Sequence, residues 1–468
     1  MSGVIGLRDV LHGTKGILRG SAAPDLLFRR VWHDSRTSEP GDLFVALRGE
    51  RHDGHDFVPE AVRRGASGAL VEASRAEELG SLGIPLIVVD DTLAALLRLA
   101  SYWRSLFDVP VVAVTGSVGK TSTKEAIAAI LGQRLRVVRS RGSFNTDVGV
   151  ALDLLTIDPD TDVVVLEFGE AYRLGEVREL CVLARPRFGV VTNVSYAHLA
   201  RMGTLERIAE SIAELPESLP DDGVAFLNGD DFRVRLMAQR THARVRLYGL
   251  SPDCQIRAEE IESRGLDGIS FALVAYGERN RVRLPLLGQH SVHHALAALA
   301  VGYEFGLTLD DMLPGFRDPR VQVRLLTVPG RNESTLLDDT YNASPSSCMA
   351  ALSLLQEIPA RRRIAVFGDM FELGWYEEQG HRMVGRRAAA VVDRLFTLGP
   401  RARWIAEEAV AAGLPAEHVF ATEDRRELLA VLRETLRPGD FVLIKGARGM
   451  RMEELVEALR ATGEERVQ

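Results

Sequence analysis

A glycine-rich loop between an apolar strand and a helix most constrains the fold of this chain. The segment VPVVAVTG is followed by SVGK and then by the helical pattern TSTKEAIAAILGQR. Glycines let backbone N–H groups approach phosphate oxygens, and the helix start adds a favourable dipole. The spacing departs from the common GxxxxGK[ST] loop, because residue 114 is valine and the first glycine is residue 116. A chance turn is disfavoured because strand, loop, GKT and helix occur in order. We expect an ATP site formed by Gly116, Ser117, Val118, Gly119, Lys120, Thr121 and Ser122.

Lysine is rare in this chain, so its positions are informative. It occurs at Lys15, Lys120, Lys124 and Lys445, and the other 53 basic residues are arginine. Arginine replaces lysine as a surface charge, but not where a compact ammonium is needed. We therefore expect Lys120 to contact the β- and γ-phosphates and the Thr121 hydroxyl to hold Mg²⁺.

Length, charge and cysteine content disfavour several classes of function. At roughly 100–200 residues per domain, 468 residues suggest three domains. A net charge of −8 disfavours nucleic-acid binding, which needs a basic face. We expect no secretory signal and no membrane insertion, since apolar runs such as 84–89 are far shorter than the ~18–20 residues of a membrane helix. Cys181, Cys254 and Cys348 suit neither a disulfide framework nor a zinc site, which favours a reducing cytoplasm. A cytoplasmic monomer is expected.

The order of strand and helix patterns predicts three α/β domains, at 1–107, 108–315 and 316–468. The first mixes short strands with helices, and the second contains the phosphate loop and further β-branched runs. A connector rich in Pro, Arg and Gly, at 313–330, leads to the third. Regular alternation of strand and helix there implies a mostly parallel sheet with helices on both faces. We predict a small N-terminal domain, a central P-loop-type mononucleotide-binding domain and a C-terminal Rossmann-like domain.

Polar residues at predicted strand ends are candidates for the ligand crevice of such sheets. Glu167 ends the run DVVVLEF and is a candidate Mg²⁺ ligand, although it could equally cap the strand. His198, in TNVSYAHLARMG, is a weaker candidate because magnesium prefers oxygen donors. Asp338 and Asp339 precede Thr-Tyr-Asn-Ala-Ser-Pro, which is either a ligand-facing turn or a solvated loop. Lys445 ends DFVLIKG in the same topological position, which favours a role in the site.

Taken together, these residues resemble the Mur ligase family over essentially the whole chain and in the family's order of domains. The matching segments are Asp34-Ser35-Arg36, GDLFVALRGERHDGHDF, TGSVGKTSTKE, SFNTDVG, Glu167, TNVSYAHL, Arg324, DDTYNASPSS, GDMFELG with the later His381, and KGARGMRME. DDTYNASP and GDMFELG are the most specific, because they resemble one member of the family rather than its relatives earlier in the pathway.

The resemblance implies an ATP-dependent amide ligase of cytoplasmic peptidoglycan precursor synthesis. Its substrates would be UDP-N-acetylmuramoyl-tripeptide and D-alanyl-D-alanine, with ATP and Mg²⁺ as cofactors. The peptide carboxylate would attack the γ-phosphorus to give an acyl phosphate, and the dipeptide amine would then displace phosphate. The third domain would close over the nucleotide and exclude water.

The resemblance also implies a role for individual residues. Catalytic roles fall to Lys120, Glu167, His198 and Arg324, and metal binding to Thr121, Glu167 and His198. Arg324 would contact phosphate and Asp338 the ribose side of ATP. The residues expected to bind substrate are Ser35, Arg36, Arg48, Gly49, Asp53, Gly54, His55, Asn145, Thr146, Tyr341, Asn342 and Ser344.

Three departures from the family pattern are visible. Ile212 stands where the family usually has a carbamoylated lysine that helps to hold a second metal. His294 and Ser291 stand where asparagines are usual, in the segment expected to contact adenine. EFGEAYRLGE is one residue longer than the usual turn after the metal-binding glutamate.

These departures leave two alternatives to the leading hypothesis. One is a divergent paralogue that joins a different amino acid or dipeptide to a related acid. The other is a nucleotide-binding regulator that no longer catalyses. A GTPase switch is disfavoured because no Asn-Lys-x-Asp signature occurs.

Overall fold

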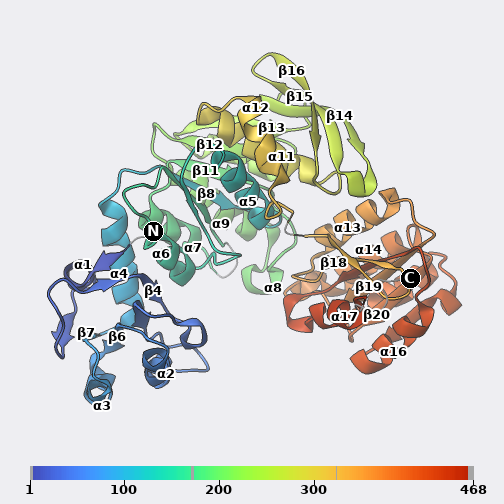
Figure 1. Cartoon of the computed structure of the whole chain (residues 1–468). Helices are drawn as coiled ribbons and strands as arrows, with labels where there is room; N and C mark the ends of the chain where they lie inside the picture. The colour runs from blue at the N-terminus through green and yellow to red at the C-terminus, as the bar shows by residue number, and fades with distance from the viewer. Residues whose placement is uncertain (1–3, 170–172, 323, 462–468) are drawn as a thin grey trace.

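The computed structural model describes residues 4–169, 173–322 and 324–461. They form three α/β domains in chain order, with the central domain between the other two (Figure 1). The predicted fold class is therefore confirmed. In this described part of the chain, no helix is both long and apolar enough to cross a membrane.

The N-terminal domain is built on a sheet in the order β2-β7-β6-β5-β4. β2 runs antiparallel to β7, and the other neighbours are parallel. The strands are β1 (Ile5–Gly6), β2 (Ile17–Arg19), β3 (Leu27–Phe28), β4 (Arg30–Trp32), β5 (Asp42–Val45), β6 (Gly68–Glu72) and β7 (Leu86–Val89). The helices are α1 (Leu7–Thr14), α2 (Val58–Arg63), α3 (Ala76–Leu79) and α4 (Thr92–Ser105). Asp91 caps α4 by accepting the Ala94 N–H at 2.9 Å.

The central domain has a larger sheet, in the order β16-β15-β14-β13-β12-β11-β8-β10-β9. Neighbours from β9 to β14 are parallel, and β14, β15 and β16 pair antiparallel. The strands are β8 (Val111–Thr115), β9 (Val137–Arg139), β10 (Val163–Glu167), β11 (Phe188–Val191), β12 (Val224–Asn228), β13 (Arg244–Gly249), β14 (Ile256–Ser263), β15 (Ile269–Ala275) and β16 (Glu278–Leu284). β14 to β16 extend from one end of the domain (Figure 1).

Helices cover both faces of the central sheet. They are α5 (Lys120–Leu131), α6 (Asp147–Leu154), α7 (Glu176–Ala184), α8 (Leu199–Met202), α9 (Leu205–Glu217), α10 (Phe232–Leu236), α11 (Ser291–Glu304) and α12 (Leu309–Met312). α5 and α11 share one core with Val112 and Val114 of β8. α6, α7 and α9 share the other core with Val111 and Ala113 of the same strand. The alternation of side chains along a strand therefore places β8, and the loop that follows it, in the middle of the domain.

The C-terminal sheet has the order β17-β18-β22-β19-β20-β21, and from β18 to β21 the neighbours are parallel. Its strands are β17 (Leu326–Pro329), β18 (Thr335–Asp339), β19 (Arg362–Gly368), β20 (Arg394–Leu398), β21 (Val419–Thr422) and β22 (Asp440–Lys445). Its helices are α13 (Pro345–Glu357), α14 (Glu377–Ala389), α15 (Arg403–Ala411), α16 (Arg425–Thr435) and α17 (Glu453–Leu459). α13 to α15 pack on one face and α16 with α17 on the other, as the alternating pattern predicted.

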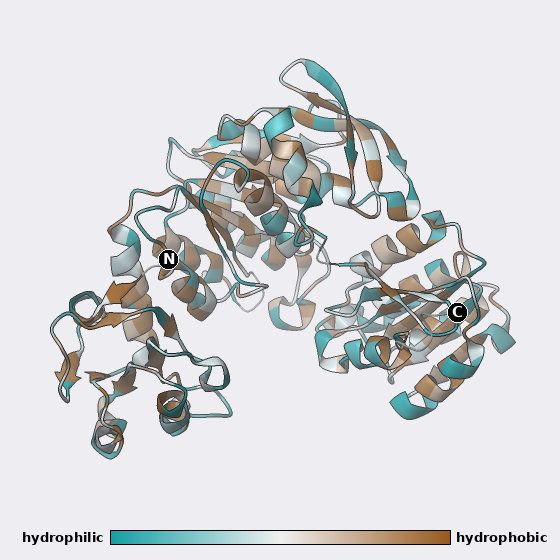
Figure 2. Cartoon of the chain, in the orientation of Figure 1, coloured by the Kyte–Doolittle hydropathy of each residue, from teal (hydrophilic) through white to brown (hydrophobic). Residues whose placement is uncertain are grey.

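The predicted connector at 313–330 was wrong in one respect, because its last part is strand β17. β17 pairs antiparallel with β18, with Leu326 opposite Asp338. The segment therefore belongs to the C-terminal sheet. Figure 2 shows hydrophobic residues concentrated on strands and on the helix faces that cover them, as expected for layered α/β domains.

Candidate active site

The predicted phosphate loop lies between β8 and α5, at the carboxyl end of the central sheet. Gly116 and Gly119 have φ angles of 129° and 86°, a left-handed region that favours glycine. A Cβ on Gly116 would lie 2.1 Å from Thr192 Oγ1, so only glycine fits there. The Lys120 ammonium donates to the Gly116 carbonyl at 2.6 Å and thus lies against the loop.

A second segment, which follows β11, holds the phosphate loop in place. Thr192 Oγ1 donates to the Val118 carbonyl at 2.8 Å. Asn193 Nδ2 also donates to that carbonyl at 2.8 Å, and Asn193 Oδ1 accepts the Val118 N–H at 3.1 Å. The Ser195 N–H donates to Ser117 Oγ at 3.0 Å. Sequence reasoning did not identify Thr192 or Asn193, because no local pattern marks a residue that braces a loop about 75 positions away.

His294 lies directly beneath the loop. Its Nδ1 is 3.0 Å from Thr123 Oγ1, and a Cβ on Gly119 would lie 2.3 Å from its Cε1. Burial, together with the charges of neighbouring histidines, lowers the pKa of His294 to about 3. The imidazole is therefore neutral at pH 7 and supports the loop without adding positive charge.

The residues present fit Mg²⁺ at the edge between β10 and the loop. Glu167 is 1% exposed; its Oε1 accepts from Asn145 Nδ2 at 3.0 Å, while its buried Oε2 has no hydrogen-bond partner among the described residues. Thr121 Oγ1 is 3.1 Å from Ser143 Oγ. A carboxylate and a hydroxyl are hard oxygen donors, and a magnesium site completes its shell with phosphates and water. In the described ranges, no group of three His, Cys, Asp or Glu side chains could hold a metal alone.

The C-terminal candidates gather around a cavity of about 320 Å³. Its lining includes Arg324, Asp338, Asp339, Tyr341 and Arg448. The Arg324 guanidinium stacks over the Tyr341 ring at 3.8 Å from its centroid, and Arg448 lies at 5.2 Å. Burial lowers the pKa of Arg324, and the charges that oppose this include Asp339 and Glu167. Arg324 of the C-terminal domain is therefore coupled electrostatically to Glu167 of the central domain.

Lys445 forms a buried ion pair beneath this cavity. Its ammonium is 2.5 Å from Asp339 Oδ2 and donates to the Asn342 carbonyl at 2.9 Å. Burial raises the pKa of Asp339 although Lys445 opposes the shift. Asp338 Oδ1 accepts from the hydroxyl and N–H of Thr340, and Ser344 caps α13. The pair orders the turn that carries Tyr341 and Asn342.

The N-terminal candidates form two loops at one edge of their sheet. Asp34 accepts from the backbone and side chain of Arg36, and Ser35 Oγ donates to Glu60 Oε2 at 2.7 Å. In the second loop, Asp53 Oδ1 is 2.5 Å from His55 Nδ1.

Arg48 belongs to this second loop, and its Nη2 lies 2.9 Å from Oε2 of Glu72 at the end of β6. The Gly49 N–H donates to the His52 carbonyl, and a Cβ on Gly54 would lie 2.4 Å from the Leu47 carbonyl oxygen. Thr146 caps α6 of the central domain by accepting the Gly149 N–H. Each loop is thus ordered by bonds within it and to the neighbouring helix α2 or strand β6. Arg36 extends into solvent with 80% of its side chain exposed.

Trp32 joins the N-terminal and central domains. The Arg30 and Arg141 guanidiniums lie 4.6 and 4.8 Å from the Trp32 ring centroid. Arg141 precedes Ser143 and Asn145 in the chain, so this contact connects the first domain to the segment beside Glu167. The sequence reading did not single out Trp32 or Arg141.

The departures from the family pattern have structural outcomes. Ile212 is fully buried in the core between α9 and the sheet, and Glu214 binds the N–H groups of Gly175 and Arg178 at the start of α7. Neither side chain supplies a metal ligand in this arrangement. Ser291, the first residue of α11, donates its hydroxyl to the carbonyl of Leu287, which precedes the helix. Residues 170–172 of the longer segment EFGEAYRLGE lie outside the described residues.

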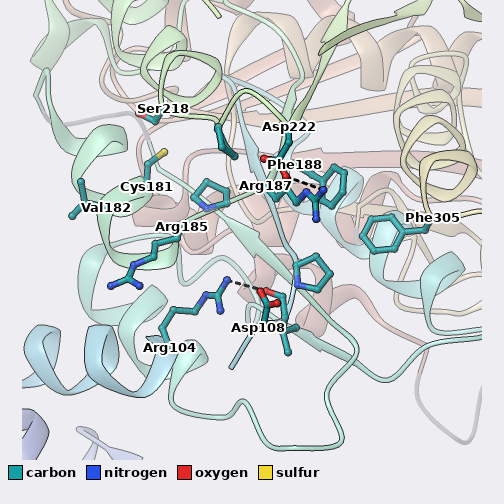
Figure 3. A pocket seen from close by; sticks show the side chains of 14 residues that line it. Arg104, Asp108, Cys181, Val182, Arg185, Arg187, Phe188, Ser218, Asp222 and Phe305 are labelled. Carbon is teal, nitrogen blue, oxygen red and sulfur yellow. Dashed lines mark hydrogen bonds and ion pairs between the residues drawn. The ribbon is translucent and has the colours of Figure 1, made fainter. Parts of the chain in front are cut away.

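A cavity of about 630 Å³ lies at the opposite, amino end of β8 and β11 (Figure 3). Two of its arginines already have partners within the protein. The Arg104 guanidinium donates to the carbonyls of Phe107, Val109 and Ala184, and Arg187 pairs with Asp222 at 2.9 Å. Ligands of open α/β sheets bind at the carboxyl ends of strands, so the phosphate loop is the better candidate site.

Comparisons with known proteins identify the family of this chain. Residues 28–104 match the Mur ligase family catalytic domain, residues 114–302 the Mur ligase middle domain and residues 323–448 the Mur ligase glutamate ligase domain. The chain is 33% identical to the UDP-N-acetylmuramoyl-tripeptide–D-alanyl-D-alanine ligase of Bacillus subtilis, with 97% of this chain and 98% of that one covered. It is 36% identical to the Escherichia coli enzyme of the same name, with 98% of each covered.

Solved structures agree as well. MurF from Acinetobacter baumannii aligns with a TM-score of 0.83 and 29% identity, over 97% of this chain and 98% of that one. MurF from Thermotoga maritima, in complex with ADP, aligns with a TM-score of 0.75 and 28% identity, over 92% and 96%. The chain belongs to the Mur ligase family.

Proposed function

We propose that this chain is an ATP-dependent ligase that joins D-alanyl-D-alanine to UDP-N-acetylmuramoyl-tripeptide. The observation that supports the proposal is the electrostatic coupling of Arg324 in the C-terminal domain to Glu167 beside the phosphate loop of the central domain. The phosphate loop, Lys120 and Glu167 come from the central domain, and Arg324 of the C-terminal domain lies within the electrostatic reach of Glu167. Such a site suits phosphoryl transfer, because the charge on the transferring group is stabilised from two sides.

The first step transfers the γ-phosphoryl group of ATP to the tripeptide carboxylate. The carboxylate oxygen bonds to phosphorus, the bond to the ADP oxygen breaks, and an acyl phosphate forms. Lys120 and the loop N–H groups bind the phosphates, and Arg324 balances charge on the opposite side. Mg²⁺, held by Thr121 and Glu167, would neutralise phosphate charge. Asn145 orients Glu167 through its 3.0 Å hydrogen bond.

The second step forms the amide. The free amine of D-alanyl-D-alanine attacks the acyl carbon, the amine loses a proton, and phosphate leaves from the tetrahedral intermediate. Tyr341, Asn342 and Ser344 lie on the turn ordered by Lys445, where the incoming dipeptide would bind. Asp338 on the same strand end would contact the ribose side of ATP. Water must be excluded during this step, because it would hydrolyse the acyl phosphate.

The N-terminal domain would hold the UDP-muramoyl end of the acid substrate. Arg36 and Arg48 are cations on ordered loops, as binding a diphosphate requires. Ser35, Gly49, Asp53, Gly54 and His55 shape those loops, and Asn145 and Thr146 lie on the central domain's side. We accordingly propose domain limits of 1–107, 108–315 and 316–468. Buried free thiols at Cys181, Cys254 and Cys348 support a cytoplasmic location, and we infer a monomer.

The test is phosphate release from ATP by the purified protein. Release is expected only when UDP-muramoyl-tripeptide and D-alanyl-D-alanine are both present, and mass spectrometry should detect the joined product. Equal release with neither substrate would refute the proposal. The third residue of the tripeptide is varied in the same assay.

A divergent acceptor specificity is the second candidate, and the burial of Ile212 favours it. A fully apolar side chain at that position removes one possible ligand from the site. A panel of amino acids and dipeptides, offered with the same acid, separates the two candidates. Turnover with another amine at a higher kcat/KM than with D-alanyl-D-alanine would select the second.

A further inference from the structure

Two residues with strained backbones meet where the central and C-terminal domains touch. His198 follows β11 and has a φ angle of 57°, and Glu372 follows β19 and has a φ angle of 62°. Residues other than glycine are uncommon in this left-handed region. Strain of this kind persists only where the surrounding structure imposes it, and it concentrates at functional sites. Here His198 and Glu372, which contact each other, both have this strained backbone conformation.

The Glu372 carboxylate is fully engaged on the opposite domain. Its Oε2 is 2.5 Å from His198 Nδ1, and its Oε1 lies 3.1 Å from Arg201 Nη2. The Glu372 carbonyl accepts the Ala200 N–H at 2.9 Å. The backbone and side chain of Glu372 thus contact three residues in or next to α8, namely His198, Ala200 and Arg201.

Aromatic residues complete the contact. The Trp375 indole N–H donates to the Gly203 carbonyl at 3.0 Å, and the Tyr376 ring stacks on Tyr196 with centroids 4.3 Å apart. Gly374 has a φ angle of 54°, and a Cβ there would lie 3.1 Å from the Ala200 nitrogen. The loop 372–376 therefore fits closely against the segment 195–203.

The same segment also reaches the phosphate loop. Thr192, Asn193 and Ser195 hold Val118 and Ser117, as described above. Within about ten residues the chain passes from the phosphate loop to the contact with Glu372. One segment therefore both contacts the C-terminal domain and supports the phosphate loop.

We propose that Glu372 is a positioning residue for His198. A carboxylate accepts hydrogen bonds, so the pair fixes a proton on Nδ1 and leaves the other ring nitrogen, Nε2, with its lone pair available to the active site. Because Glu372 belongs to the C-terminal domain, the imidazole takes this orientation only when that domain is docked. The assignment of His198 to the active site rests on the proposed function; the coupling between the two residues does not.

Kinetics of single and double variants test whether Glu372 acts through His198. Glu372→Ala is expected to lower kcat by about 10–100-fold, as for other residues that orient a ligand, with the KM for ATP changed less than about twofold. Glu372→Gln should recover part of the loss, because its amide oxygen still accepts the Nδ1 proton. In a His198→Gln background, Glu372→Ala should cost less than about twofold more.

The matched control is Glu378→Gln, since Glu378 pairs with Arg382 on the surface of α14 within one domain. It should leave kcat within about twofold. Equal losses from Glu372→Ala in both backgrounds would overturn the proposal.

A second measurement needs neither substrate nor metal. Long-range ¹H–¹⁵N NMR reports which histidine nitrogen carries the proton, and His198→Gln identifies the His198 signal. The wild type should show the Nδ1-protonated form, and Glu372→Ala should lose that preference. An unchanged tautomer would overturn the proposal. If the tautomer changes as expected but no ligase activity is found, the positioning stands and the proposed function fails.

Discussion

Replacing Gly119 with alanine tests how tightly the phosphate loop is built. Gly119 has a φ angle of 86°, and an added Cβ would lie 2.3 Å from His294 Cε1. The imidazole cannot retreat freely, because its Nδ1 is hydrogen-bonded to Thr123. The left-handed backbone costs an alanine about 1–2 kcal/mol. Overpacking against the ring adds about 1–3 kcal/mol, so the total is about 2–5 kcal/mol.

Gly83→Ala supplies the matched control for this change. Gly83 has a φ angle of 73°, and a Cβ there would meet nothing within 4 Å in the described part of the chain. It should therefore show the backbone cost alone. Urea unfolding measures both variants: the cost of Gly119→Ala is read from the central-domain transition, which ADP moves to higher urea, and the cost of Gly83→Ala from the transition of the N-terminal domain. The affinity for ADP is measured by calorimetry.

The imidazole contact is isolated by a double variant. In a His294→Ala background, Gly119→Ala should cost only what Gly83→Ala costs in the wild type. In the wild-type background it should cost at least about 1 kcal/mol more and weaken ADP binding by at least about tenfold, because the loop N–H groups move. Equal costs for Gly119→Ala and Gly83→Ala would refute the reasoning.

Three further predictions follow from buried or charged groups. Lys120→Ala should slow phosphate release by more than about 10³-fold, because loop N–H groups cannot replace the ammonium; near-normal turnover in the same assay would contradict this. Glu167→Gln should weaken Mg²⁺-dependent ATP binding by about tenfold or more while metal-free ADP binding stays unchanged, as calorimetry would show; equal loss in both would assign Glu167 a structural role only. Burial raises the pKa of Asp153 to about 7, above its ordinary value of 3.8. Its neutral form therefore stabilises the fold at low pH, and this stability is lost as pH rises from about 4 to about 7. Asp153→Asn should flatten the fall in unfolding free energy between about pH 4 and 7, and an unchanged slope in urea titrations would contradict the assignment.

The elements built on local patterns could be predicted from the sequence. Strand β22 was predicted from the continuous apolar run DFVLIKG, and a helical period marks α16. No element was predicted at 244–284, where β13 to β16 occur. Half or more of the residues of β14 and β16 are charged and most of these are partly or fully exposed, so the apolar signal is diluted.

The candidate site likewise has a part that a local sequence pattern predicts and a part that it does not. Residues 116–122 are contiguous, and their spacing alone predicts a phosphate loop. The contacts of Asn193 with Val118, Arg141 with Trp32 and Glu372 with His198 join segments 75 or more residues apart. Nothing in the composition around either partner indicates such a pair. These contacts depend on how the domains pack, which only the folded chain reveals.

The segment from Thr192 to Gly203 touches the phosphate loop at one end and the third domain at the other. Binding equilibria that share a structural element are reciprocal: if the docked domain tightens the grip on ATP by some factor, ATP tightens the docking by the same factor. A small aromatic compound that wedges between the rings of Tyr196 and Tyr376 would then act as an inhibitor that competes with no substrate. It would reduce nucleotide affinity without contacting the nucleotide site, by separating the C-terminal domain from the central domain.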